Sequence, residues 1–298
     1  MGSRAGWSAA SPDKMLGIII HCTMGAPSTD GNWRADILFY AVYDIGSVPS
    51  VFARSIEFFL EVSMATRPLF IPADHPNRFV TTLNLEFHWH AGFSLTQKQN
   101  NITGLHTAAA SAGFSRVLEV STKSQDLVGR RLSAFNLTVE LEDGNSIPLE
   151  SAFQGSKVFE RGGPFDDLYR AEPSVAKRDP RLHASGRLVE FKFGSQRMAN
   201  TPPTAFYDWL YINAVLRSGI DMKSILSYDG FTDIEFNPKK SLNCQARACA
   251  QLVSMHHRGL LNQNAISALQ YLHFVATPST TLAESCDAGD FWDSRIGV

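Results

Sequence analysis

The chain has 298 residues, of which 44% are hydrophobic and 19% are charged, and its formal net charge is −2 at pH 7. This length can bury one large core or two modest ones. The near-neutral charge balance excludes a bulk attraction to nucleic acid or to an acidic membrane, so a nucleic-acid substrate would need a local basic surface.

The apolar run 15–20 is too short for a transmembrane helix or a signal peptide. We therefore expect a cytoplasmic protein with no membrane partner. Its four cysteines lack metal-ligand spacing and are expected to be free thiols.

The first 63 residues differ from the rest of the chain. They begin with a leader of small residues and continue into an apolar stretch, 36–59, without clear helix caps. Met64 precedes the sequence Ala-Thr-Arg-Pro-Leu-Phe-Ile-Pro, which is typical of the start of a folded unit. We therefore interpret residues 1–63 as an extension of unknown status, either an upstream translation start or a helical appendage.

Strand patterns dominate the next part of the chain, from residue 67 to about 120. Residues 79–87 alternate apolar and polar side chains, as a half-buried strand does. A helix is predicted at 101–112, and short strands are predicted at 117–120 and at 137–142, where Asp143-Gly144 forms a turn.

The later part of the chain is richer in helix signals. Pro148 suits the first turn of a helix, which we expect to end at Gly162-Gly163-Pro164. Further helices are predicted at 203–217 and 244–258. Strands gathered early and helices later predict an α+β fold, with a strand-rich N-terminal part and a largely helical core.

The predicted helix after Pro148 carries four chemically distinct side chains. Glu150 and Lys157 are seven residues apart, so on one continuous helix they share a face and lie about 10 Å apart along the axis. Phe153 and Gln154 lie between them on this face. Glu150 in the first turn is favoured in its ionised form by the positive helix end. Charges that merely complement the helix dipole give the same pattern and are common, so spacing alone does not establish a site.

The neighbouring motifs resemble the NADAR (YbiA-like) family, whose pattern is Leu-Ser-Asn-Phe followed by Gly, Pro, Glu, Phe-Gln and Lys. Ala134 departs from the family's Asn, and Ser151 stands where His is common. Gly186-Arg187 is similar to a Gly-Arg pair of the family. The matching residues are 132–135 (LSAF), Gly144, Pro148, Glu150, Phe153, Gln154 and Lys157.

From about residue 67 to residue 258 the chain is most similar to the NADAR antitoxins encoded beside DNA ADP-ribosyltransferase toxins. The segments that carry this similarity are 92–94 with Gln97-Lys98, Leu118-Glu119-Val120 with Lys123-Ser124, 132–137, 150–159, 162–164, 176–181, 206–211 and 231–246. The resemblance implies a NADAR-type catalytic domain at 64–278, with a strand-rich part at 64–128 and a glycosidase core at 129–278. Residues 279–298 form a C-terminal tail in this division.

The resemblance implies a hydrolase that breaks the N-glycosidic bond between a ribose and an amine-bearing base. In the antitoxin branch the substrate is ADP-ribose on the amino group of guanine in DNA, and the implied partners are this ADP-ribosylated DNA and a cognate toxin. Glu150 and Lys157 are the implied catalytic residues, and no cofactor is implied. An ionised Glu150 could stabilise positive charge on the ribose and orient water. Lys157 could neutralise a phosphate, steady the leaving base or form an imine, and the sequence does not choose among these roles.

Several further residues are candidates for ligand binding. The glycine pair 162–163 could approach a phosphate, or could simply end a helix. Aromatics at 206–211 are expected to be largely core, with Phe206 and Leu210 inside and residues 207–209 available to a base. Asp233 and Glu235 alternate in a strand-like segment and could bind ribose hydroxyls or face solvent. The predicted ligand-binding set is Ser133, Phe135, Phe153, Gln154, Gly162, Gly163, Pro164, Trp209, Asp233, Glu235 and Asn243.

The one dense basic cluster is the best candidate for contacts with DNA phosphates, although such a cluster is usually a solvated surface. Its residues are Lys177, Arg178, Arg181 and Arg187. His88-Trp89-His90 supplies only two ligands on one side of a strand, so we expect no metal.

Two other functions are compatible with these residues. One is an N-glycosidase that acts on a small ribosyl-amine nucleotide metabolite of the riboflavin-pathway type. The other is a non-catalytic module that binds ADP-ribose. Cleavage of free nucleotides far faster than modified DNA would favour the first, and tight binding without turnover would favour the second.

Overall fold

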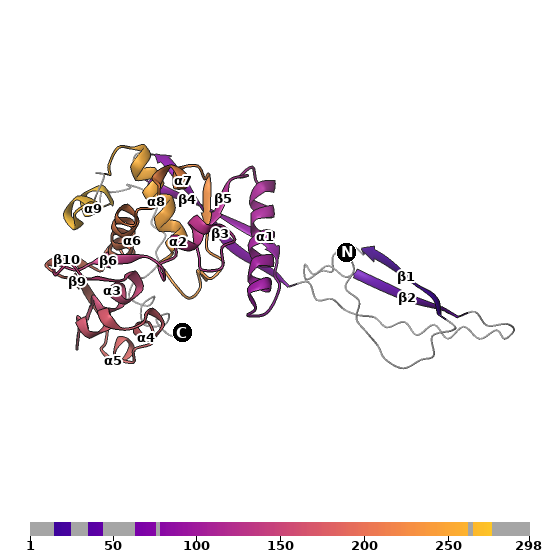
Figure 1. Ribbon diagram of the computed structural model, residues 1–298, viewed down its shortest axis with the longest axis horizontal. Helices are drawn as coiled ribbons and strands as arrows, with labels where there is room; N and C mark the ends of the chain where they lie inside the picture. The colour runs from indigo at the N-terminus through magenta and orange to yellow at the C-terminus, as the bar shows by residue number, and fades with distance from the viewer. Residues whose placement is uncertain (1–14, 25–34, 44–62, 76–77, 262–264, 276–298) are drawn as a thin grey trace. The chain divides into compact units, whose positions relative to one another are not determined.

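The computed structural model describes residues 15–24, 35–43, 63–75, 78–261 and 265–275, and divides the chain into two compact units, Met1–Ser63 and Met64–Val298. In the first unit, β1 (Met15–Met24) and β2 (Ala35–Tyr43) pair in antiparallel fashion (Figure 1). The expectation of a helical appendage is therefore wrong for residues 36–43, which form a strand. The physical reason is that this stretch is rich in aromatic and β-branched residues, which favour strands. The division of the second unit at residue 129 stays a prediction, and the predicted tail 279–298 lies outside the described residues.

A four-stranded sheet organises the first part of the second unit. β3 (Met64–His75) pairs antiparallel with β4 (Arg78–His88), and the strand order is β4-β3-β11-β5. β11 (Gly230–Thr232) is antiparallel to β3 and parallel to β5 (Val117–Glu119). A strand from late in the chain thus lies between two early ones, which brings residues after 232 beside residues near 119.

Two clusters of buried side chains lie on the two faces of this sheet. Successive residues of a strand point to opposite faces. Leu69 accordingly joins a small cluster with residues of α1 (Leu95–Ser111), whereas Phe70 joins the main core. α8 (Gln245–His257), which supplies buried residues to the main core, packs on β3 and β4.

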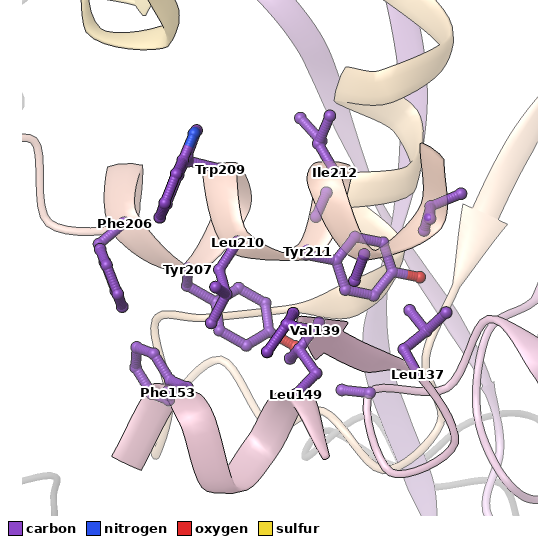
Figure 2. Close-up of a cluster of buried hydrophobic side chains, with 14 of the residues drawn as sticks. Leu137, Val139, Leu149, Phe153, Phe206, Tyr207, Trp209, Leu210, Tyr211 and Ile212 are labelled. Atoms are coloured by element: carbon purple, nitrogen blue, oxygen red, sulfur yellow. The ribbon is translucent and has the colours of Figure 1, made fainter. Parts of the chain in front are cut away.

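The main core extends from this sheet to a group of smaller elements around α6 (Ala205–Arg217). α3 (Leu149–Gly155) packs against α6, and Phe153 of α3 stacks on Phe206 of α6 (Figure 2). The ring of Phe191 stacks on both. The strands here are β6 (Thr138–Glu140) and β7 (Ser146–Pro148), which pair with each other, and β8 (Lys157–Phe159), β9 (Leu188–Phe193) and β10 (Gln196–Ala199), which form a sheet of order β10-β9-β8. The short helices are α2 (Leu127–Arg131), η2 (Asp166–Arg170), α4 (Pro173–Ala176), α5 (Arg181–Ala184), α7 (Met222–Leu226) and α9 (Ala268–Val275).

The mixture of helices and sheets confirms the α+β class. The predicted strands at 79–87 and 117–120 and the helices at 203–217 and 244–258 are confirmed within a few residues. The predicted segregation of strands into an early part is not what the fold shows, because β8, β9 and β10 pair within the later part. The helix predicted at 101–112 begins at Leu95, where Ser94 and Gln97 form a capping box.

Within the described residues, no helix is long and apolar enough to cross a bilayer. Cys244 and Cys249 are buried free thiols there, and the side chains of Cys22 and Cys286 lie outside this part.

The core predicts a contrast between two leucines. Leu252 on α8 is fully buried in the main core, whereas Leu269 on α9 is 80% exposed. Leu252→Ala should lower the free energy of unfolding by about 2–5 kcal/mol, because it removes buried apolar surface and leaves a cavity. Leu269→Ala should change it by less than about 0.5 kcal/mol. Urea unfolding of both variants measures the difference, and equal losses would contradict this assignment of the core.

Candidate active site

Glu150 and Lys157 do not share one helix, as the sequence had led us to expect. α3 ends at Gly155, Ser156 is its C-cap, and Lys157 begins β8 opposite Phe191 of β9. Gly155 leaves no room for a side chain, since a Cβ there would lie 2.6 Å from the Tyr169 ring. The glycines at 162–163 therefore do not end the helix. The expectation fails because strand pairing with β9 outweighs the helical pattern of the segment.

A single amide joins the two predicted catalytic residues. Lys157 Nζ donates a hydrogen bond of 2.7 Å to Gln154 Oε1, and Gln154 Nε2 donates one of 2.9 Å to Glu150 Oε1. The amide of Gln154 has one acceptor and one donor side, and this chain uses both in a defined orientation. Glu150 and Lys157 are therefore coupled through Gln154 without touching each other.

Lys157 is almost completely withdrawn from solvent. Its side chain is 4% exposed, and Nζ lies 4.8 Å from the centroid of the Phe153 ring. Burial lowers the pKa of Lys157 to about 8, because the protein interior solvates the ammonium form poorly, and the carboxylate of Glu150 opposes this effect. Lys157 is therefore mainly protonated near neutral pH, but its uncharged fraction is far larger than that of an ordinary lysine.

These side chains open into a cavity of about 670 Å³. Three buried side chains line it, those of Glu150, Lys157 and Tyr207. Residues between 233 and 245, which follow β11, line it as well. Three cations also border the cavity, and no ion pair within the described residues engages them. They are Lys177, Arg178 and Lys240.

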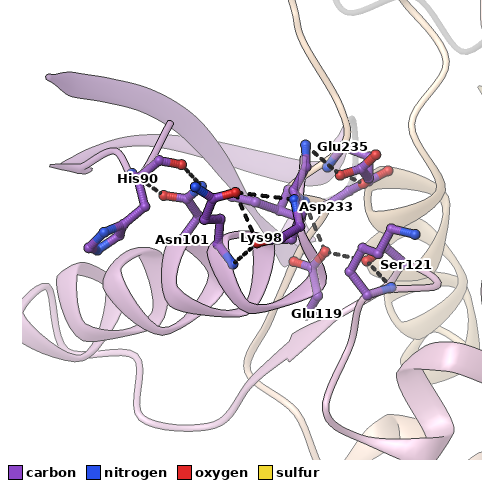
Figure 3. A network of polar contacts seen from close by, with 11 residues as sticks. His90, Lys98, Asn101, Glu119, Ser121, Asp233 and Glu235 are labelled. Atoms are coloured by element: carbon purple, nitrogen blue, oxygen red, sulfur yellow. Dashed lines mark hydrogen bonds and ion pairs between the residues drawn. The ribbon is translucent and has the colours of Figure 1, made fainter. Parts of the chain in front are cut away.

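Two carboxylates from the end of β11 line the same cavity. Asp233 is buried, and its Oδ1 accepts a hydrogen bond of 3.0 Å from the backbone N–H of Glu235. Glu235 forms an ion pair of 2.9 Å with Lys98 of α1 (Figure 3). Burial, together with the negative charge of Glu119, raises the pKa of Asp233 to about 8. The cavity thus contains an acid and an amine whose pKa values have both moved toward neutrality.

Most of the residues predicted to bind ligand meet at this cavity, but some do not. Trp209 lines a different cavity, where its indole N–H donates to the carbonyl of Ile266 at 2.8 Å. Ser133 is buried beside the cavity, and residues 162–164 pack behind Lys157. The predicted ligand-binding residues that line the cavity are Phe135, Phe153, Gln154, Asp233, Glu235 and Asn243.

The predicted basic cluster is divided by the fold. Lys177 and Arg178 border the cavity. Arg181 forms ion pairs with Asp167 and Asp179, and its hydrogen bonds hold the pKa of both carboxyls below their usual range. Arg187 is paired with Glu160. The four cations therefore do not form one surface for phosphate binding.

Several residues of the cavity were missed in the sequence. Lys240, Asn237 and Gln245 were not among the predicted site residues, although all belong to the segment 231–246 that carries the family resemblance. Gln245 Oε1 accepts a hydrogen bond of 2.8 Å from the backbone N–H of Ala134, which fixes the 132–135 motif against α8. Of residues 207–209, which the sequence made available to a base, Tyr207 lines this cavity.

Metal ligands do not converge anywhere in the described ranges of the chain. His88 Nδ1 and His90 Nε2 lie 3.3 Å apart, and this pair contacts no third candidate ligand.

Residues 65–285 match the family described as DarT1-associated NADAR antitoxin. The chain belongs to this NADAR family. The matched region contains every residue that lines the cavity, including both ends of the hydrogen-bonded chain from Glu150 to Lys157. No curated protein gives a significant match to the sequence.

Substitution of Gly163 in this NADAR protein tests whether the close packing of the backbone at Lys157 stabilises the fold. The φ of Gly163 is +87°, and a Cβ there would lie 2.2 Å from the Lys157 carbonyl oxygen. Gly163→Ala should therefore cost about 1–3 kcal/mol in backbone strain and also force the Lys157 backbone to move, which adds to the loss. Gly144 has a φ of +82° but nothing within 4 Å of its Cβ position, so Gly144→Ala should cost only the strain. Urea unfolding of both variants measures the difference, and equal losses would contradict the prediction.

Proposed function

We propose that this NADAR protein is an N-glycosidase that removes ADP-ribose from the amino group of guanine in DNA and so acts as the antitoxin of a DNA ADP-ribosyltransferase toxin. The observation that carries the proposal is the Glu150–Gln154–Lys157 chain, which lies in a cavity bordered by unpaired cations. Membership in the antitoxin family supports the choice of modified DNA as the substrate.

The distribution of charge in the cavity fits the parts of ADP-ribose. Lys177, Arg178 and Lys240 are positioned to bind a diphosphate, because each is a cation with no ion pair to the described part of the chain. The Glu235 carboxylate is an acceptor for a ribose hydroxyl, and Asp233 lines the same cavity. Aromatic rings suited to stacking on a flat base also line the cavity, namely Phe135, Phe153, Tyr207 and Phe236.

Lys157 is best suited to act as the nucleophile. Its deep position leaves the phosphates to the cations at the border of the cavity, and desolvation supplies the uncharged amine that attack on carbon requires. In the substrate, the nitrogen lone pair opens the ribose ring, whose oxygen takes a proton, and an imine forms between C1 and the guanine amino nitrogen. The Lys157 amine adds to C1, and the C1–guanine bond then breaks with its electron pair on the protonated guanine nitrogen.

Glu150 completes the reaction by activating water. The Lys157 imine that remains on C1 is attacked by a water molecule whose proton passes to the Glu150 carboxylate. The C1–Lys157 bond breaks, its electron pair returns to the lysine nitrogen, and ADP-ribose is released. Gln154 holds the base and the nucleophile at a fixed separation through its two hydrogen bonds.

The proposed activity is tested on an oligonucleotide that carries ADP-ribosylated guanine. We expect wild-type protein to release ADP-ribose, and we expect Glu150→Gln to release it about 10²–10⁴ times more slowly, because the amide cannot take the proton of water. Chromatography of the products measures both rates. No release by the wild type would overturn the function, and full release by Glu150→Gln would overturn the role of Glu150. Faster cleavage of free ribosyl-amine nucleotides than of DNA would point to a small metabolite as the substrate.

The nucleophile is tested by borohydride reduction during turnover. We expect the imine on Lys157 to be trapped, with a mass increase of the peptide that contains this residue, because reduction makes the C–N bond permanent. Lys157→Arg should give no trapped species, whereas Lys177→Arg, which changes a cation at the border, should still be trapped. Below about pH 8 the rate should fall with falling pH, since protonation of Lys157 removes the attacking lone pair. Turnover by the wild type without any trapped peptide would contradict this role.

A further inference from the structure

Glu119 is a buried carboxylate that the proposed reaction does not yet use. It ends β5, is 2% exposed, and belongs to the Leu118-Glu119-Val120 motif. Its Oε1 accepts hydrogen bonds of 2.7 Å from Ser121 Oγ and 2.9 Å from the backbone N–H of Ile234. Its Oε2 accepts a hydrogen bond of 2.7 Å from Thr232 Oγ1. Such a complete set of partners indicates a carboxylate held for its charge, because an unneeded buried acid would be costly.

The surroundings of Glu119 are neutral dipoles. Thr232 Oγ1 also lies 2.9 Å from His106 Nε2, and burial lowers the pKa of His106 to about 4, so this imidazole is uncharged near neutral pH. Glu119 therefore has hydroxyl and backbone donors but no cation among the partners that it contacts. Its charge is not cancelled locally and acts on the next ionisable group.

That next group is Asp233, which directly follows Thr232. Asp233 lies between Thr232 and Ile234, which both donate hydrogen bonds to Glu119, so the two carboxyl groups are near enough for the charge of Glu119 to act on Asp233. Glu119 is held by three donors and is withdrawn from the substrate cavity, whereas Asp233 lines the cavity. Two buried carboxylates at such close range do not both ionise readily, and one proton is shared by the pair. Burial raises the pKa of both carboxyl groups, but the three hydrogen-bond donors of Glu119 favour its ionised form, so Glu119 takes the charge and Asp233 keeps the proton.

Two cations lie near Asp233. Arg67 of β3, which donates to the Thr66 carbonyl at 2.9 Å and lies over the Trp89 ring, interacts electrostatically with Asp233, whereas Lys98 of α1 is paired with Glu235. The remaining titratable neighbours are Tyr207 of α6 and Cys244 before α8, and burial raises the pKa of both well above its usual value, so they are neutral. Glu150 and Lys157 line the same cavity as Asp233.

We propose that Asp233 is the proton donor to the departing guanine amine and that Glu119, ionised behind it, is the positioning residue that keeps this proton on Asp233. The proposal rests on the glycosidase function proposed above. An amine is a very poor leaving group as an anion, so the C1–N bond can break only if its nitrogen is protonated. In this step the Asp233 O–H bond breaks, the proton forms an N–H bond on guanine, and the electron pair of the C1–N bond stays on that nitrogen. Asp233 is left as a carboxylate and regains a proton from solvent before the next turnover.

The rate as a function of pH separates this role from a structural one. Wild-type kcat/KM should fall above about pH 8, as Asp233 loses its proton. Glu119→Gln removes the negative charge behind Asp233, so the fall of kcat/KM on the alkaline side, the alkaline limb of the profile, should begin about one pH unit lower. Ser121→Ala removes one donor to Glu119, makes its ionised form less stable, and should move the limb in the same direction by less. Ser124→Ala is the matched control, because this buried serine of the same loop donates no hydrogen bond to Glu119 and should leave the limb in place.

The role of Asp233 itself is tested by replacing the proton donor from solution. Asp233→Ala should lose about 10²–10⁴ in rate on the modified oligonucleotide. Imidazole buffer near pH 7 should restore part of this loss, because imidazolium can enter the vacated space and donate a proton. Glu235→Ala, which removes a neighbouring carboxylate that lines the same cavity, should not respond to imidazole.

Defined outcomes would overturn the proposal while leaving the function intact. If wild-type protein cleaves the substrate but Asp233→Ala gains nothing from imidazole, then Asp233 only binds the ribose. If Glu119→Gln lowers the rate equally at every pH, Glu119 only supports the fold. If Glu119→Gln fails to fold, an unmoved limb in Ser121→Ala would overturn the role of Glu119. Failure of the wild type to release ADP-ribose would instead count against the function proposed above.

Discussion

The site depends on one local event, which is the change from helix to strand at Gly155–Ser156. A continuous helix would carry Lys157 onward along the axis and away from Glu150. Instead, the chain turns into β8, and Lys157 points back so that its ammonium or amine nitrogen meets Gln154. Gly155 permits the turn because the Tyr169 ring occupies the space where a side chain would lie. The pairing of β8 with β9 then fixes the register, and the cavity forms around the result.

Burial acts in opposite directions on the two ionisable groups most important to the proposed chemistry. It penalises whichever form is charged, so it lowers the pKa of Lys157 and raises that of Asp233, and both values come to about 8. An amine that is partly free and an acid that is partly protonated can then coexist near neutral pH. The fold achieves this by placing Lys157 at the start of β8 and Asp233 directly after β11.

The sequence predicted the parts of the molecule that local pattern controls. Strong alternation gave β4, and strong helical periodicity gave α6 and α8. The family motif pointed to Glu150, Gln154 and Lys157, whose side chains do meet. The turn at Gly155 was missed because its cause, the pairing with β9, comes from residues more than thirty positions later. The cationic cluster was also misjudged, since the partners of Arg181 and Arg187 become neighbours only after folding.

The division of that cluster has a consequence for how this NADAR protein would select its substrate. Arg181 and Arg187 are neutralised within the chain, so their charges are not available to a DNA backbone, and the net charge of −2 adds no general attraction. The cations without an internal partner that we identify at the site, Lys177, Arg178 and Lys240, border the cavity itself. Under the proposed function, binding energy would therefore be concentrated on the ADP-ribosyl group that enters the cavity. Such an enzyme would recognise the ADP-ribosyl modification more strongly than the DNA that carries it, which is what an antitoxin that repairs scattered lesions requires.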